Sequence, residues 1–474
     1  MARGRTHGQA MRGSEQVPRL PAPRGFFGRM FHELPTFRVR DEFLRELARG
    51  MKESEGQQSA AGDNENLPAG FTYFGQFVDH DLTLDRSALG ETMFDPEQLR
   101  NFRTPRFDLD SLYGRGPRNS PALYARGGVK LLVGHNPEVD EDDTALDRDD
   151  LPRNQDGIAL IGDPRNDENI IVSQLHLTFI RFHNRLVDVV REQGVFEDAD
   201  EVFKEAHRLA RWHYQWIVVH DFLARLVPEG LIAALLTPTE DPRVRTRFYR
   251  PEGQWAFMPV EFSAAAYRFG HSMVRPTYLI NSIVPELPIF SQNESPHPLE
   301  AFHGNRRLPD SWTVRWPFFF ELDEEGPQLS RKINTKLAEG LFNLPGESGE
   351  MELLALRNLR RGVRLGLPSG GRVARAMGES PLSAEELGFP GPAPLWFYVL
   401  KEAELRGESR GERLGPVGGR IVAEVFLGIL GADPLSFVNV EPDWIPASES
   451  IGSTPVNSLA ELIRFAAPAQ AERG

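Results

Sequence analysis

Apolar residues recur with the period of a helix through most of the chain. Between residues 170 and 191 they return every three or four positions, and the same period continues over 201–226. In a third pattern, Phe43, Leu44 and Leu47 share one face. Alternation typical of strands is rare and short, and we find no internal repeat. These patterns predict a mainly α-helical protein with little β structure and long loops rich in proline and glycine.

Composition separates the start of the chain from the rest. Residues 1–40 are rich in Arg, Pro and Gly and offer few apolar side chains, which predicts a flexible N-terminal extension. No long polar linker interrupts residues 41–465, so we expect one large domain there and a short tail at 466–474. The acidic run at residues 138–150 is typical of a solvated loop.

Charge and cysteine content exclude several classes of function. The chain has 54 basic and 68 acidic residues, a net charge of −14, which argues against a general nucleic-acid binder. It has no cysteine, so thiolate catalysis, cysteine-ligated metals and disulfides are excluded. No apolar run approaches the roughly 18 residues of a transmembrane helix. The first residues lack the apolar stretch of a signal peptide. We expect a cytoplasmic protein, or one exported by a route without a recognisable signal.

One short segment combines a histidine with acids and a glutamine. Gln76, Asp79 and His80 are spaced i, i+3 and i+4, so they share a face if this segment is helical, whereas Asp81 points elsewhere. Acids beside a histidine in an apolar setting are costly to bury without partners. Taken alone, the segment is compatible with a functional site and with an incidental histidine on a helix surface.

Oxygen-bearing positions alternate a short distance further on. Thr104, the backbone carbonyl of Arg106, Asp108 and Asp110 can converge on one hard cation, and Asp81 adds another carboxylate. Ca²⁺ prefers roughly six to eight oxygen ligands. A polar turn explains the same spacing equally well.

A third candidate pair follows at the start of the long 170–191 pattern. Arg165 and Glu168 are three positions apart, so they can face one cavity if a helix begins there. An ion-pairing first helical turn is the alternative, because acids are favoured at that position.

Five segments in order resemble one known family. GQFVDHD, TPRFDLDSLYG, PRNDEN with LHLTFIRFHNRL, AYRFGHSMVRP and RNLRRGVRLGLP are similar to segments of the animal haem peroxidases, members of the peroxidase-cyclooxygenase superfamily. The matches span roughly residues 65–380. The resemblance implies a haem b oxidoreductase that reduces hydrogen peroxide and oxidises a small reducing substrate, such as a halide, thiocyanate or a phenol, through a ferryl state.

The resemblance also implies roles for individual residues. His80 would be the distal base that moves the peroxide proton, a task suited to an imidazole. Arg165 would stabilise the negative charge that develops as the O–O bond breaks. Gln76 would bind distal water and help to place an anionic substrate. His271 would ligate the iron, and Asn358 would accept the hydrogen bond from its other ring nitrogen.

Further matches concern attachment of the haem. Asp79 and Glu168 match carboxylates that form ester links to haem methyl groups in mammalian members. Asn169 stands where myeloperoxidase has the methionine of a sulfonium link, so we expect no third link, a closer similarity to lactoperoxidase, and no chloride oxidation. Arg268 and Arg361 match arginines near the haem, and we expect Arg361 to pair with a propionate.

The oxygen-rich segment matches the calcium site of the family. The implied ligands are Asp81, Thr104, Arg106, Asp108 and Asp110. Because Asp81 adjoins His80, a bound cation would pin the distal helix. We therefore predict that chelation loosens the haem pocket.

Parts of the sequence are compatible with three other interpretations. Fatty-acid dioxygenases of the same superfamily carry a radical-forming tyrosine three residues before the proximal histidine. That position is Arg268 here, and Tyr267, one step back, would point about 100° away on a helix. The second alternative is a haem-binding protein without turnover. The third is a non-haem metal site built from His176, His183, His207 and His213. The oligomeric state cannot be inferred from the sequence.

Overall fold

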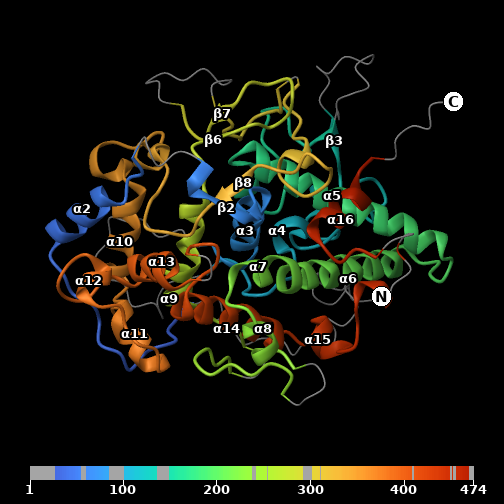
Figure 1. Ribbon diagram of the computed structural model, residues 1–474. Helices are drawn as coiled ribbons and strands as arrows, with labels where there is room; N and C mark the ends of the chain where they lie inside the picture. The colour runs from blue at the N-terminus through green and yellow to red at the C-terminus, as the bar shows by residue number, and fades with distance from the viewer. Residues whose placement is uncertain are drawn as a thin grey trace.

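The computed structural model places most of the chain in one compact arrangement of helices (Figure 1). It describes residues 27–54, 60–84, 101–135, 149–237, 242–252, 255–291, 301–309, 311–407, 410–448, 451 and 455–468. Its architecture is mainly α-helical with little sheet, as predicted. None of the helices in these ranges combines the length and apolar character needed to cross a membrane.

The α-helices vary from one turn to six. They are α2 (Asp41–Gly50), α3 (Gly70–Leu82), α4 (Asp110–Tyr113), α5 (Ile170–Glu192), α6 (Ala199–Ile217), α7 (Ala224–Leu226), α8 (Leu231–Leu235), α9 (Val260–Ser263), α10 (Leu354–Arg364), α11 (Gly370–Met377), α12 (Ala384–Leu387), α13 (Leu395–Arg406), α14 (Pro416–Ala432), α15 (Phe437–Val440) and α16 (Leu459–Ala466). Short 3₁₀ segments include η6 (Pro164–Asp167) and η8 (Ala266–Met273). The helices predicted from Asp41 and over residues 170–191 are confirmed.

Helix α3 lies near the middle of the molecule, against the long helix α5 (Figure 1). Its residues are buried on nearly every side, which is typical of a core helix rather than a surface helix. Phe77 of α3 stacks on Phe179 of α5 with ring centroids 4.8 Å apart, and both rings meet Tyr214 of α6 edge-on. This aromatic cluster fixes the position of α3 and therefore of the residues at its end.

The helical pattern over 201–226 is interrupted by a wider turn. Helix α6 ends at Ile217, and residues Val218–Leu223 form a π-helix, η7, before α7 resumes the α-helical path. Such π-segments inside helices often mark functional sites. Here the segment carries Phe222, whose ring lies against Phe74 of α3.

The strands are short and pair in twos within the described residues. β1 (Phe27–Gly28) is parallel to β5 (Met258–Pro259). β2 (Asp63–Pro68) is antiparallel to β8 (Leu329–Arg331), with an irregular register between Asp63 and Pro68. β3 (Gly134–His135) pairs with β4 (Asp149–Asp150), and β6 (Thr277–Tyr278) pairs with β7 (Leu287–Pro288), both antiparallel.

The N-terminal segment corrects one prediction. Residues 27–40, which we assigned to a flexible extension, pack against the domain, and Phe27, Phe31 and Phe37 are buried. The buried carboxylate of Glu261 accepts hydrogen bonds from the backbone N–H groups of Met30 and Phe31. These contacts join residues more than 200 positions apart, which local composition cannot reveal. Residues 1–26 lie outside the described ranges.

Candidate active site

One cavity joins the two histidines singled out in the sequence. It has a volume of about 490 Å³ and is lined by both His80 and His271. Its remaining walls are mostly apolar and aromatic, including Phe71, Phe222 and Phe269. A large apolar cavity with a few convergent polar groups is typical of a cofactor site.

His80 lies in the last turn of α3 and is buried. Its Nδ1 is 2.8 Å from Oδ1 of Asn166, and its Nε2 is 3.9 Å from a carboxylate oxygen of Glu168. Burial, together with the positive charge of Arg165, lowers the pKa of His80 to about 4. The ring is therefore neutral at pH 7 and can accept a proton.

Three polar side chains beside His80 are joined to one another. Gln76 donates a hydrogen bond to Glu168 and accepts one from Nδ2 of Asn169 at 3.2 Å. Asn169 is also the N-cap of α5, because its Oδ1 accepts from the backbone N–H of Val172. Burial raises the pKa of Glu168 to about 7, although 43% of its side-chain surface is accessible. Gln76, Glu168 and Asn169 all line the cavity, as does Asp79.

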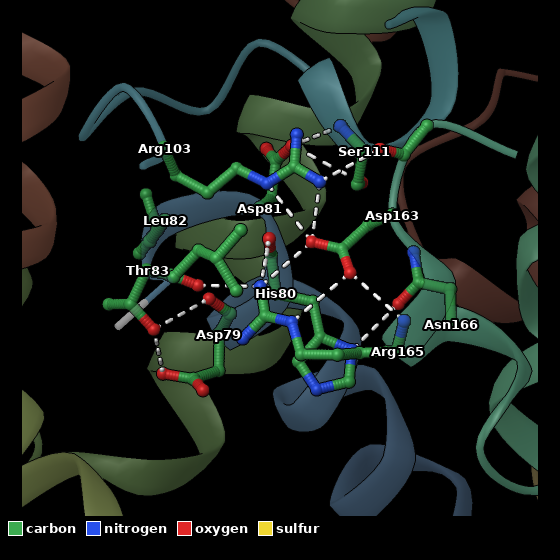
Figure 2. Close-up of polar contacts among 12 residues, drawn as sticks. Asp79, His80, Asp81, Leu82, Thr83, Arg103, Ser111, Asp163, Arg165 and Asn166 are labelled. Carbon is green, nitrogen blue, oxygen red and sulfur yellow. Dashed lines mark hydrogen bonds and ion pairs between the residues drawn. The ribbon is translucent and has the colours of Figure 1, made fainter. Parts of the chain in front are cut away.

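The side chain of Arg165 is held by an ion pair with Asp163 and by two backbone carbonyls. Figure 2 shows Asp163 between the guanidinium groups of Arg103 and Arg165. Nη2 of Arg165 also donates to the backbone carbonyls of His80, at 3.0 Å, and of Thr83, at 2.6 Å. Arg165 is absent from the described lining of the cavity. The guanidinium is thus next to the distal histidine and bound to its backbone carbonyl, and the predicted role of Arg165 in charge stabilisation stays a prediction.

Asp163 holds this arrangement together. It is fully buried and accepts hydrogen bonds from both arginine side chains and from the backbone N–H of Arg165. Burial alone would raise its pKa, but Arg165 and Arg103 outweigh burial and hold the pKa well below its usual range. This segment lies close to Ser111 at Gly162, where a Cβ would meet the carbonyl oxygen of Ser111 at 2.5 Å.

His271 lies in η8 and also lines the cavity. Its Nδ1 is 2.9 Å from Nδ2 of Asn358, a buried residue of α10. The Asn358 oxygen accepts from Nη1 of Arg268 at 3.2 Å. Burial, and then the charge of Arg268, lower the pKa of His271 to about 3. The predicted contact between His271 and Asn358 is present, but the amide nitrogen of Asn358 faces His271, so the predicted acceptor role of Asn358 stays a prediction.

A smaller cavity of about 30 Å³ adjoins the larger one. Its lining includes Arg268 and Arg361, and it shares Ser263 and Arg268 with the larger cavity. The two predicted arginines are therefore brought together at one edge of the site. Their guanidinium groups are suited to bind carboxylates there.

The oxygen-rich segment, residues 104–110, lies next to α3, and Asp81 of α3 makes the contact. The fully buried Asp81 carboxylate accepts hydrogen bonds from the backbone N–H groups of Leu109 and Ser111. Burial and the nearby charge of Asp110 raise the pKa of Asp81 to about 7. Burial and neighbouring acids also raise the pKa of Asp108. Leu109, between Asp108 and Asp110, has a left-handed backbone with φ of 59°, which is rare for a bulky residue.

The remaining predicted calcium ligands flank this loop. The side chain of Arg106 points to Asp433, 4.0 Å away, so only its backbone carbonyl is suited to bind a cation. The backbone carbonyl of Thr104 accepts a hydrogen bond from the N–H of Arg106. No three His, Asp or Glu side chains are gathered as a ready metal site in the described part of the chain. The calcium site thus stays a prediction.

Tyr267 requires a correction. We expected its side chain to point away from the site, but it lines the large cavity together with Arg268. The expectation placed the cavity along one face of this segment, whereas the consecutive residues 267–271 all line it. The Tyr267 hydroxyl donates to the carbonyl of Gly75 at 3.1 Å, and burial raises its pKa well above the usual value.

Sequence reasoning missed several residues at the site. Asn166 contacts His80 directly, and His303 lines the cavity. Asn166 directly follows Arg165, but the distal roles predicted for this motif concerned its charged residues. His176 was considered as a metal ligand, but its Nδ1 contacts Nδ2 of Asn166. His183 instead contacts the Tyr113 hydroxyl, so these histidines do not form the alternative metal site within the described residues.

Comparison with known families agrees with this geometry. The family model described as animal haem peroxidase matches residues 84–387, which is more than half of the chain. The chain therefore belongs to the animal haem peroxidase family. The match begins just after α3, so the roles of Gln76, Asp79 and His80 depend on the motif and the cavity.

Individual relatives are distant. Dog thyroid peroxidase is 28% identical over 221 residues, which are 44% of this chain and 21% of that protein. The chain thus spans about a fifth of the length of that relative. Peroxinectin A from Dictyostelium discoideum is 24% identical over 379 residues, 69% of this chain and 66% of that protein.

Solved structures share the fold. Peroxidase A from Dictyostelium discoideum aligns with a TM-score of 0.60 at 17% identity, covering 96% of this chain and 99% of that one. A fatty acid alpha-dioxygenase from Arabidopsis thaliana aligns with the same TM-score at 14% identity, covering 93% of this chain and 77% of that one. The fold is therefore common to both activities and does not separate them.

Proposed function

We propose that this protein is a haem peroxidase that reduces hydrogen peroxide and oxidises a small donor such as bromide, iodide, thiocyanate or a phenol. The observation that carries the proposal is that one cavity is lined by both His80 and His271, whose rings are neutral at pH 7. The family assignment supports the same activity. When bound, haem supplies the iron that receives peroxide and stores the oxidising equivalents.

The proximal residues fit a haem ligand. A neutral imidazole binds iron through one ring nitrogen, and the other nitrogen then needs an acceptor. With Nε2 of His271 on iron, Nδ1 carries the proton, so Asn358 must turn its oxygen towards His271. Arg268 would then release Asn358 and, with Arg361, bind the haem carboxylates at the adjoining small cavity.

On the distal side, His80 would carry the proton chemistry. Its Nε2 would accept a proton from peroxide bound in the cavity and would return that proton to the oxygen that leaves as water. Burial keeps the ring in its basic form at neutral pH. Arg165 would act through its charge from behind the His80 backbone, since its hydrogen bonds hold it there. Gln76 would bind distal water.

Asp79 and Glu168 are suited to ester links with the haem. Both carboxylates line the large cavity, so both can reach the edge of a macrocycle. Haem would cover the accessible surface of Glu168 and strengthen the effect of burial on its pKa. Asn169 cannot form a sulfonium link, and its amide is already engaged with Gln76 and with the first turn of α5. We therefore propose two links at most.

Peroxide-dependent oxidation of a phenol by the haem-loaded protein tests this function. We expect steady turnover that requires peroxide, without oxygen uptake when a polyunsaturated fatty acid replaces the phenol.

A fatty-acid dioxygenase is the second candidate, because Tyr267 lines the cavity. Its hydroxyl donates to a backbone carbonyl, which is a poor proton acceptor for radical formation. Oxygen uptake that disappears in Tyr267→Phe, with no phenol oxidation, would favour the dioxygenase.

Calcium removal gives a separate prediction. We propose that Ca²⁺ binds Asp81, Asp108 and Asp110 with the carbonyl of Arg106 and Thr104, because the buried carboxylates raise one another's pKa without a cation. Saturating Ca²⁺ at about 100 times its Kd should stabilise the fold by roughly 2.7 kcal/mol. Chelation should lower the melting temperature and perturb the haem absorption band. Unchanged melting and absorption after verified calcium removal would contradict this site.

A further inference from the structure

One asparagine side chain connects the distal histidine to a second buried histidine. Oδ1 of Asn166 lies 2.8 Å from Nδ1 of His80, and Nδ2 of the same amide lies 2.9 Å from Nδ1 of His176. All three residues are buried. Nε2 of His176 has no hydrogen-bond partner among the described residues. The Asn166 amide therefore uses both of its ends to contact imidazole rings.

The chemistry of an amide links the proton positions of these two rings. The amide oxygen only accepts, so Nδ1 of His80 must carry the proton and Nε2 keeps a free lone pair. The amide nitrogen only donates, so Nδ1 of His176 accepts and its proton lies on Nε2. Turning the amide over would exchange both tautomers, and His80 would then carry its proton on Nε2. In that state it could not take a proton from a ligand in the cavity.

Local structure holds Asn166 at this position. Its backbone N–H donates to the carbonyl of Asp163 at 3.0 Å within the η6 turn. The Asp163 carboxylate is in turn fixed by Arg103 and Arg165. Burial lowers the pKa of His176 to about 3, so this ring is neutral and can accept the amide proton. The backbone and the second histidine thus constrain the amide from two sides.

We propose that Asn166 and His176 are positioning residues that hold His80 with a free Nε2 directed at the large cavity. This inference rests on the proposed function, because it assigns His80 the task of accepting a proton there. Asn166 acts on His80 directly, and His176 acts by selecting the orientation of the Asn166 amide. Neither residue lines the cavity among its described walls, so both act through His80.

Cyanide binding to the ferric, haem-loaded protein is a direct readout besides turnover. Hydrogen cyanide must give its proton to a base as cyanide binds, so its association rate reports a free Nε2 on His80. A positioned base contributes about 100-fold or more to such proton transfers. We therefore expect Asn166→Ala to slow cyanide association by at least about tenfold. Asn166→Asp keeps an acceptor oxygen for Nδ1 of His80 and should stay within about threefold of the wild type.

A matched control separates positioning from packing. Gln174 lies on α5, two residues from His176, is buried, and its amide nitrogen has no hydrogen-bond partner in the described residues. Gln174→Leu should therefore leave cyanide association within about twofold of the wild type. If Asn166→Ala does not take up haem, His176→Leu tests the proposal in its place. We expect its cyanide association rate to fall by about fivefold, which corresponds to the loss of one hydrogen bond.

The outcomes are distinct. An unchanged cyanide association rate in Asn166→Ala overturns the proposal, and so do equal losses of rate in Asn166→Ala and Asn166→Asp. If Asn166→Ala does not take up haem, an unchanged rate in His176→Leu overturns it. The cyanide association rate of His80→Ala is measured in the same way. Failure of the proposed function would appear as a wild type that does not react with peroxide. Failure of this inference alone would appear as a slow His80→Ala beside a normal Asn166→Ala.

Discussion

Replacing His80 by alanine is expected to slow the reaction of the haem-loaded protein with hydrogen peroxide by about 100- to 10,000-fold. The variant loses the neutral imidazole that lines the cavity and would accept the proton of peroxide. Glu168, 3.9 Å away in the wild type, does not replace it, because it is hydrogen-bonded to Gln76. Stopped-flow absorption at the haem band measures the rate.

Two controls accompany this measurement. His80→Ala should still bind haem, since His271 and its partner Asn358 belong to η8 and α10 and are unchanged in this variant. His135→Ala removes an exposed histidine of β3 and should react like the wild type. A peroxide rate in His80→Ala within about threefold of the wild type would contradict the assignment of the distal base.

Replacing Asp163 by alanine is expected to destabilise the fold by about 3–5 kcal/mol. Asp163 is fully buried and is the shared partner of Arg103 and Arg165, so its loss leaves two guanidinium groups without their carboxylate (Figure 2). Chemical denaturation of the wild type and the variant measures this difference. Asp188→Ala removes a partly exposed ion pair with Lys130 and should cost less than about 1 kcal/mol.

The sign of the pH dependence follows from the pKa of Asp163, which the folded protein holds below its usual range. A lowered pKa contributes stability above the pKa of the unfolded state, and this contribution is lost as the pH falls. The difference between the wild type and Asp163→Ala should thus be constant near neutrality and shrink below about pH 4. A difference below about 1 kcal/mol at pH 7 would contradict the structural role of this carboxylate.

The sequence predicted the helical framework and much of the site because both depend on local patterns. The long apolar period over 170–191 identifies α5, and the spacing of Gln76, Asp79 and His80 places three polar groups of α3 on the cavity.

Other features depend on contacts between distant segments. The orientation of Arg165 is set by the carbonyl of Thr83, from another element of the chain, as well as by Asp163. The link from His80 through Asn166 to His176 joins α3, η6 and α5, and no spacing rule relates these residues. Phe222 reaches the cavity through a π-turn inside a helix whose apolar period predicts no interruption.

The absorption spectrum of the purified, haem-loaded protein before and after one equivalent of peroxide tests the central claim most directly. We predict a haem band that depends on His271, shifts on addition of peroxide, and returns when a phenol is added. A protein that takes up no haem, or whose haem band does not change with peroxide, would contradict a cavity in which His80 and His271 serve one cofactor from its two sides.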